Sequence, residues 1–245
     1  MKLFHVHTYR CGHAENVPDE AYVQAALKLG AGDIWFTDHA PFPGDPFGSR
    51  MRYSELEEYI AALSELKRKY TDINIHIGLE TEYFPGFDKA GYYSFLRSIP
   101  ELELLLLGQH MAEISSEPLD YSFSLSHEEL DAEEYRHLGN AILQGIDTGY
   151  FGAVAHPDRI FRRMKEWDEG KAEISLRIIK AAAEKSLPLE RNLSSPDTDY
   201  GFTPEFWQLV PEGTKLITGL DAHSVRDMVS RTERREELLS LFCSE

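Results

Sequence analysis

The sequence has few cysteines, no long apolar run and a shortage of positive charge, and each shortage excludes a class of protein. Among its 245 residues are only two cysteines, Cys11 and Cys243, too few for a disulfide framework and typical of a reducing compartment. No window reaches the roughly 18 apolar residues of a membrane span, and histidines interrupt the N-terminus where a signal peptide needs an apolar run. We therefore expect a soluble, cytoplasmic protein with no membrane partner and with both cysteines as free thiols.

The charge balance limits the partners. Lys and Arg number 25 against 42 Asp and Glu, which gives a formal net charge of -17. A surface this acidic repels the phosphate backbone of long nucleic acids, so we exclude them as partners. A small phosphorylated metabolite remains possible, because metal ions and a local arginine can reverse the sign of the field inside a pocket. The sequence does not indicate an oligomeric state.

The order of apolar and amphipathic segments predicts an α/β barrel. Seven short apolar runs alternate with longer amphipathic stretches, the pattern of βα units around a parallel sheet. The predicted strands are 3–7, 33–37, 74–80, 103–108, 152–155, 187–192 and 215–220. The predicted helices are 19–29, 54–70, 88–98, 128–148, 171–185 and 225–241. Segments 40–50 and 195–203 are rich in turn-forming residues and are expected to be loops. Nothing divides the chain, so we predict one domain over residues 1–245.

Polar side chains occur where each predicted strand ends. In a parallel barrel the carboxyl ends of the strands share one rim, so these side chains should meet. They are His5, His7, Asp38, His39, Glu80, His110, His156, Asn192, Asp221 and His223. Imidazole suits zinc and other first-row divalent ions, and carboxylates can bridge two such ions. The rim therefore predicts a metal cluster, whereas His76, His127 and His137 are expected to be structural, with His76 in the core.

The same residues form motifs that resemble those of the PHP (polymerase and histidinol phosphatase) family over nearly the whole chain. The motifs are His5-x-His7 with His13 after it, Thr37-Asp38-His39, Gly78-Leu79-Glu80, Gln109-His110, Ala155-His156-Pro157-Asp158 and Gly219-Leu220-Asp221-Ala222-His223. The resemblance implies a distorted TIM-like (β/α)7 barrel with a site for three divalent ions, which zinc, manganese or iron would all suit.

The resemblance also implies how the ligands are shared. One metal would take His5, His7, Glu80 and Asp221; a second would share Glu80 and add His110 and His156; a third would take His13, His39 and His223. Glu80, Asp221 and Asp38 would be the catalytic carboxylates, with Asp38 orienting a histidine ligand.

Within the family, the chain most resembles the histidinol-phosphate phosphatases. The stretches that carry this are the cysteine before His13, 38–41, 78–83 and 156–159. The implied reaction is hydrolysis of L-histidinol phosphate in histidine biosynthesis, through a hydroxide held between the two metals that share Glu80. Arg159 and Asn192 are predicted to bind the substrate, Arg159 through its bidentate fork. The loop 195–199 lacks the basic residue that the family pattern would place there, which leaves other substrates open.

Four alternatives remain at this point. The first is a PHP-type phosphoesterase for a nucleotide or sugar phosphate. The second is an exonuclease, which the acidic surface opposes. The third is a hydrolase of C–N bonds, which would usually need a lysine among the ligands, and no strand ends in one. The fourth is a metal-binding protein without activity, which would be expected to close its coordination shells.

Overall fold

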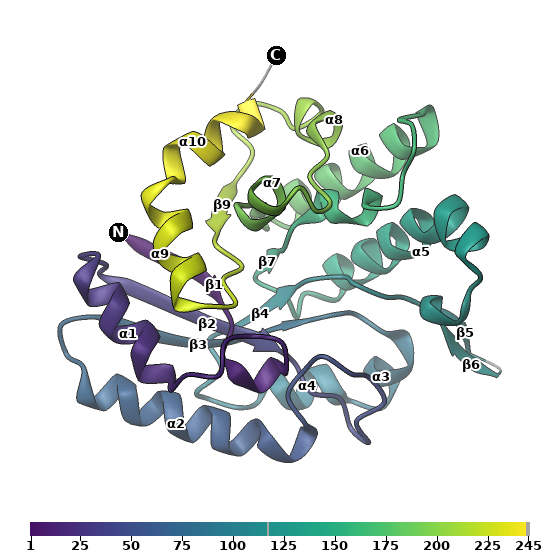
Figure 1. Cartoon of the computed structure of the whole chain (residues 1–245). Coiled ribbons are helices and arrows are strands. Elements are labelled where there is room, and N and C mark those ends of the chain that lie inside the picture. The colour runs from purple at the N-terminus through teal and green to yellow at the C-terminus, as the bar shows by residue number, and fades with distance from the viewer. Residues whose placement is uncertain (117, 244–245) are drawn as a thin grey trace.

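Seven parallel strands follow one another around the centre of the molecule (Figure 1). The computed structural model describes residues 1–116 and 118–243. Each strand is hydrogen-bonded to the next in the order β1-β2-β3-β4-β7-β8-β9. Their bounds are β1 Lys2–Val6, β2 Asp33–His39, β3 Asn74–Thr81, β4 Leu104–Leu107, β7 Ala153–Val154, β8 Leu189–Asn192 and β9 Leu216–Gly219.

The sheet closes by contact between its first and last strands. The backbone N–H of Leu220 donates to Phe4 O at 2.8 Å, and that of His7 donates to Ala222 O at 2.9 Å. The ring is uneven because β7 contributes only two residues, which pair with Leu106 and Leu107 of β4. This architecture is the distorted (β/α)7 barrel that the sequence predicted.

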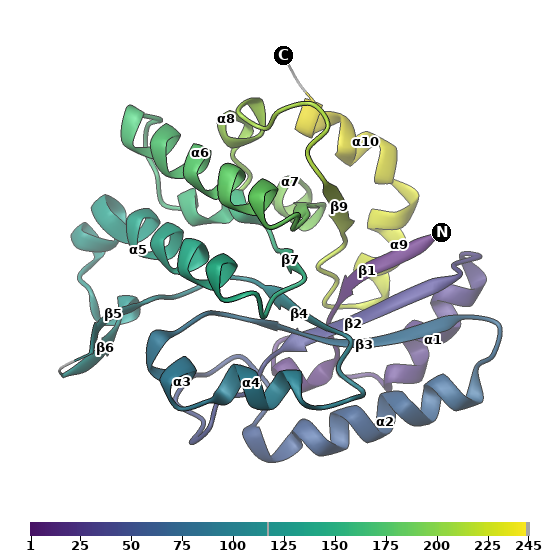
Figure 2. The ribbon, with the colours of Figure 1, turned by 180° about the vertical axis from the view of Figure 1, so that it is seen from behind.

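Helices surround the barrel on its outer side (Figure 2). The longer ones are α1 Asp19–Lys28, α2 Leu56–Lys69, α5 His127–Thr148, α6 Glu169–Glu184 and α9 Val225–Glu233. The shorter ones are α3 Pro85–Lys89, α4 Tyr92–Arg97, α7 Ser194–Thr198, α8 Pro204–Gln208 and α10 Arg235–Ser240, with 3-10 turns at Tyr9–Cys11, Tyr53–Glu55, Ser122–Ser124, Pro157–Phe161 and Leu241–Cys243. A small hairpin, β5 Glu113–Ser116 and β6 Leu119–Tyr121, follows β4. No described helix has both the length and the apolarity that a bilayer crossing requires.

The seven predicted strands all form, whereas three helix and loop predictions need correction. The predicted helix 88–98 is interrupted at Gly91, whose φ of +81° ends one helix and starts another. The predicted helix 225–241 is divided near Arg234 into α9 and α10. The loop expected at 195–203 contains the short helix α7, which begins at Ser194. The loop at 40–50 is irregular as predicted.

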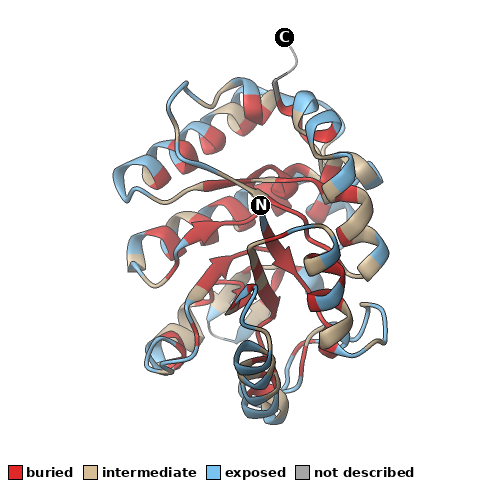
Figure 3. Ribbon diagram, turned by 90° about the vertical axis from the view of Figure 1, so that its left-hand side faces the viewer, coloured by how far each residue is buried: buried red, intermediate tan, exposed pale blue. Residues whose placement is uncertain are grey.

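The core has two parts. Most buried apolar side chains lie between the strands and the helices, whose outer faces are exposed (Figure 3). A second cluster of Phe4, Leu106, Ala153 and Ala155 fills the barrel interior. His76 is not the core histidine that we expected: it is partly exposed, stacks on Trp35 and contacts Asp33 and Glu103. The side chain of Cys243 lies outside the described part of the chain.

Candidate metal centre

All nine predicted metal ligands meet at the carboxyl ends of the strands. His5 and His7 come from β1 and the residue after it, His39 and Glu80 from β2 and β3, and the others from the loops that follow strands. In the parallel register His39 lies opposite Glu80, so both side chains face the barrel interior. Five groups of three side chains place their ligand atoms within 4.8 Å of one another. These groups are His5–His7–Glu80, His5–His156–Asp221, His39–Glu80–His110, His13–His39–His223 and His7–Cys11–His223.

Glu80 is the centre of the cluster because its two oxygens face different histidines. Oε2 lies 3.3 Å from His5 Nε2 and 3.1 Å from His39 Nδ1. Oε1 lies 2.7 Å from His156 Nε2 and 3.6 Å from His110 Nε2. A carboxylate with one oxygen toward each set of rings has the arrangement required to bridge two cations.

Asp221 and the remaining rings complete the other side of the cluster. Asp221 Oδ1 lies 3.3 Å from His7 Nε2 and 3.9 Å from His5 Nε2. The rings of His13 and His223 stack with their centroids 4.5 Å apart, and His13 is 5.4 Å from His39. This third group joins the loop after β1 to the ends of β2 and β9.

Four of the histidines are oriented through their Nδ1 atoms, which leaves Nε2 free to bind. His5 Nδ1 lies 2.7 Å from Glu190 Oε1, and His110 Nδ1 lies 3.1 Å from Glu82 Oε1. The other two contact main-chain carbonyls: His13 Nδ1 lies 3.0 Å from Cys11 O, and His223 Nδ1 lies 3.2 Å from Asp221 O. Carboxylates and carbonyls in these positions fix the tautomer of metal-binding histidines. Sequence reasoning missed Glu82 and Glu190.

The donor atoms fit a metal cluster because the protein itself leaves them without partners. His5 Nε2, both ring nitrogens of His7, Glu80 Oε2 and His223 Nε2 are buried without a hydrogen bond. Leaving a buried polar atom unpaired costs about 1–3 kcal/mol, and here several such atoms converge. Divalent cations would supply the missing partners, and the mixture of imidazoles and carboxylates suits first-row metals.

The protonation states also suit metal binding. Burial, with the neighbouring rings, lowers the pKa of His7 and His223 to about 3. Burial likewise lowers the pKa of His39 and His156 to about 4, so these rings are neutral near pH 7. Burial opposes ionisation of Asp221, but Arg159 and the histidines hold its pKa well below the usual range. Neutral imidazoles and ionised carboxylates are the forms that bind metal. His5 is the exception: burial opposes its ionisation, but Glu190 and Glu80 hold its pKa well above the usual value, so it would lose a proton when metal binds.

Backbone conformation at the site is unusual. Three of the predicted ligands, His5, His156 and Asp221, have positive φ angles of 68°, 27° and 49°. Such angles are costly for residues other than glycine and cluster at functional sites. Two glycines also make room for carboxylates: a Cβ at Gly108 would lie 2.0 Å from Glu80 Oε1, and one at Gly219 would lie 1.7 Å from Glu190 Oε1.

The predicted substrate residues lie beside the cluster. Arg159 is 8% exposed and donates from Nη2 to Asp221 Oδ2 at 2.8 Å, so it is not a solvated surface arginine. The same atom lies 3.4 Å from Asn192 Oδ1 and 3.2 Å from Ser195 Oγ. A cavity of about 400 Å³ opens here, lined by Arg159, Met111, the segment 48–50 and five rim residues, which are four histidines and Asp221.

A second arginine in this cavity was not predicted. Arg50 comes from the loop between β2 and α2, and its fork contacts Glu82 at 2.9 and 3.1 Å. Glu82 in turn contacts His110, so Arg50 is joined to a rim histidine through one buried carboxylate. Burial opposes ionisation of Glu82, but Arg50 and His110 hold its pKa well below its usual value. The cavity therefore contains two cations even though the loop after β8 supplies none.

Asp38 does not orient a histidine, contrary to our prediction. Its carboxylate accepts hydrogen bonds from Thr8 N and Thr8 Oγ1, both at 2.7 Å. Side chains alternate along a strand, so Asp38 points to the face of β2 opposite His39. Burial raises the pKa of Asp38 to about 7. Asp38 therefore fixes the start of the loop that carries His13, rather than a ligand ring.

Comparisons with known proteins give the family. The PHP domain family matches residues 4–194. The chain is 29% identical to a histidinol-phosphatase of Bacillus subtilis, over 91% of this chain and 94% of that protein. It is 28% identical to a protein named "Probable histidinol-phosphatase" of Deinococcus radiodurans, over 89% and 85%. A solved structure from Lactococcus lactis, a histidinol phosphate phosphatase complexed with zinc, L-histidinol and phosphate, has a TM-score of 0.71 at 22% identity and covers 98% of this chain and 93% of that one. The chain belongs to the PHP domain family.

Proposed function

We propose that this protein hydrolyses L-histidinol phosphate to L-histidinol and phosphate, as a single PHP-type domain over residues 1–245. The protein is a phosphoric monoester hydrolase of the PHP family that uses divalent metal. The observation that supports the proposal is the division of Glu80 between two sets of histidines, with Arg159 beside them at the cavity. Cytoplasmic location and participation in histidine biosynthesis stay predictions.

The predicted ligands fall into three groups, one for each of three divalent ions. We infer that His5, His7, Glu80 and Asp221 hold one ion, that His110 and His156 hold a second with Glu80, and that His13, His39 and His223 hold a third. When bound, such ions lower the pKa of a water toward about 7 and neutralise phosphoryl charge. The identity of the ions, zinc, manganese or iron, is not fixed by this ligand set.

The protein's own side chains would position the phosphate group and stabilise its charge. Arg159, held by Asp221 and Ser195, would direct its remaining donors toward the non-bridging oxygens of the phosphate. Asn192 positions this arginine and the Glu190 carboxylate, since its amide contacts both. Fixed donors of this kind stabilise charge in the transition state without reorganisation.

Phosphate release from a substrate panel tests the proposal. The panel contains histidinol phosphate, nucleotides, sugar phosphates and an aryl phosphate, assayed with zinc, manganese or iron. Glu80→Ala should abolish turnover of every substrate because it removes the shared ligand. Arg159→Ala should raise KM for all of them when it is assayed in excess metal, which is needed because Arg159 also contacts the proposed ligand Asp221. Arg177→Ala, on the exposed face of α6, is the matched control.

One observation favours a second candidate, a PHP phosphatase for another small phosphate ester. The loop after β8 lacks a basic residue, and the second cavity arginine comes instead from the loop after β2. If histidinol phosphate does not exceed the other substrates by orders of magnitude in kcat/KM, this candidate replaces the first. Absence of turnover with every substrate and metal would contradict both.

A further inference from the structure

His7 differs from the other rim histidines in the surroundings of its ring. His5, His13, His110 and His223 each have a partner for Nδ1. Among the described residues, His7 is the one histidine whose two ring nitrogens are both buried without a hydrogen bond. Its Nε2 faces Asp221 and Glu80, at 3.3 and 3.6 Å. Its Nδ1 therefore lies on the side of the ring away from these carboxylates and lacks an orienting carboxylate or carbonyl.

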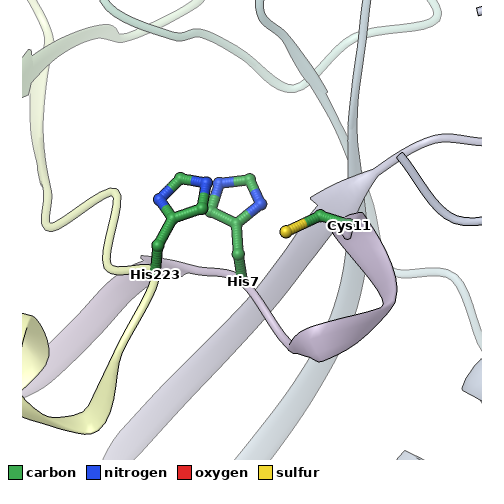
Figure 4. A group of neighbouring side chains, drawn as sticks. All are labelled: His7, Cys11 and His223. Carbon is green, nitrogen blue, oxygen red and sulfur yellow. The ribbon is translucent and has the colours of Figure 1, made fainter. Parts of the chain in front are cut away.

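Cys11 occupies that side of the ring (Figure 4). Its side chain is 0% exposed, and its Sγ lies within 4.8 Å of ring nitrogens of His7 and His223. In the close-up the sulfur points toward the His7 ring, at a ring nitrogen on the edge opposite His223. The main chain of Cys11 has a related function, because its carbonyl accepts from His13 Nδ1 at 3.0 Å.

We propose that Cys11 is a positioning residue for His7: in the metal-loaded protein its sulfur accepts the Nδ1–H of His7, so that Nε2 binds the ion. A neutral imidazole that binds metal through Nε2 must carry its proton on Nδ1, and that proton needs an acceptor in a buried site. Sulfur is a weak acceptor, but Sγ lies at this edge of the ring (Figure 4). One residue would then orient two ligands, His7 through its side chain and His13 through its carbonyl.

Two variants separate this proposal from simple packing. Cys11→Ser keeps an acceptor, whereas Cys11→Ala removes it, and both keep the main-chain carbonyl that faces His13. The backbone N–H groups of His13 and Ala14 also face the Cys11 sulfur, so a serine hydroxyl could be useful to the loop alone, and the variants are compared at the His7 ring itself. If Cys11 acts only on the loop or fills space, neither variant should change which nitrogen of His7 carries the proton. If Cys11 orients His7, serine should keep the proton on Nδ1 and alanine should not. We expect alanine to weaken zinc binding by about 10–100-fold, as is typical when a group behind a ligand is lost.

The measurement is zinc affinity, by competition with a chromophoric chelator, with thermal unfolding of the metal-free proteins alongside. Tighter zinc binding by Cys11→Ser than by Cys11→Ala, with the His7 proton on Nδ1 in the serine variant and not in the alanine variant, supports the proposal. Zinc binding by Cys11→Ala that equals or exceeds that of Cys11→Ser, or the same His7 tautomer in both variants, overturns it. The inference rests on the proposed metal centre, so wild-type zinc binding is measured first. Failure of the wild type to bind zinc would reject both the centre and this inference, whereas binding with the reverse order of variants would reject the inference alone.

A measurement on the wild type needs no variant to fold. Nitrogen NMR of the zinc-loaded protein, with labelled histidine, should find the His7 proton on Nδ1 and zinc at Nε2. The opposite tautomer would overturn the proposal. Loading with Co²⁺ tests whether the sulfur is instead a direct ligand: a thiolate-to-cobalt charge-transfer band in the near ultraviolet would also overturn it, and we expect no such band.

Discussion

Replacing Glu190 by glutamine tests whether a carboxylate behind the ligands controls metal affinity. Glu190 is fully buried and makes three contacts: His5 Nδ1 at 2.7 Å, the backbone N–H of His156 at 3.0 Å and Asn192 Nδ2 at 3.0 Å. It therefore orients one ligand by its ring, a second by its main chain, and the residue that contacts Arg159. Glutamine has a similar shape but removes the charge and turns one acceptor into a donor.

The expected loss follows from the contact to His5. Loss of such a partner typically weakens metal binding by about 10–100-fold, or about 1.4–2.7 kcal/mol. Zinc titration against a chelator measures this change, with Glu184→Gln, an exposed residue at the end of α6, as the control. If Glu190→Gln binds zinc as tightly as the control and only unfolds more easily, Glu190 is merely part of the packing and the reasoning is refuted.

Three further predictions concern the same centre. Gly219→Ala should release bound metal, because the new Cβ would meet Glu190 at 1.7 Å, and metal content measures it; a full complement of metal would contradict this. Arg50→Met should weaken zinc binding by about tenfold, because Glu82 loses its contacts with the Arg50 guanidinium and no longer fixes His110. Unchanged zinc affinity would show that Glu82 holds the His110 ring without Arg50. The metal-free protein should lose stability as the pH falls from about 6.5 toward 4. The folded pKa values of His7, His39, His156 and His223 are depressed to about 3 or 4, so the unfolded chain binds more protons in that window. Three groups oppose this trend: the pKa of His5 is raised, and burial raises the pKa of Asp38 to about 7 and that of Asp158 to about 6. Denaturation midpoints at several pH values measure the net change, and a midpoint that rises as the pH falls would contradict the prediction.

The strands and the rim were predictable because both follow from local pattern. Apolar runs bounded by polar residues mark buried parallel strands, and the carboxyl ends of such strands must share a rim. Those two facts place His39, Glu80 and His110 together without any knowledge of distance. The hairpin β5–β6 was not predicted, since its strands are only four and three residues long and lack a clear apolar alternation.

The residues that orient the ligands could not be found in the same way. Glu82 lies two residues beyond Glu80, and Glu190 lies in the middle of β8, where a carboxylate is easily interpreted as a chance polar residue. What distinguishes Glu190 is that Gly219 on the neighbouring strand leaves space for it, a relation between residues 29 positions apart that no local pattern contains. Strand alternation would have corrected Asp38, because adjacent residues on a strand cannot both face the barrel interior.

The charges at the centre explain how so acidic a chain could hold a phosphate. The centre contains four carboxylates and two arginines, Glu80, Glu82, Glu190, Asp221, Arg50 and Arg159, so with neutral histidines its formal charge is -2 (four negative, two positive). The three divalent ions that we propose would bring six positive charges and make the total +4. The surplus would be confined to the buried centre, whereas the chain as a whole carries -17. Attraction between the site and a small anion would then depend on the ions, and the acidic surface would still repel long polyanions, whose charges cannot all reach the cavity.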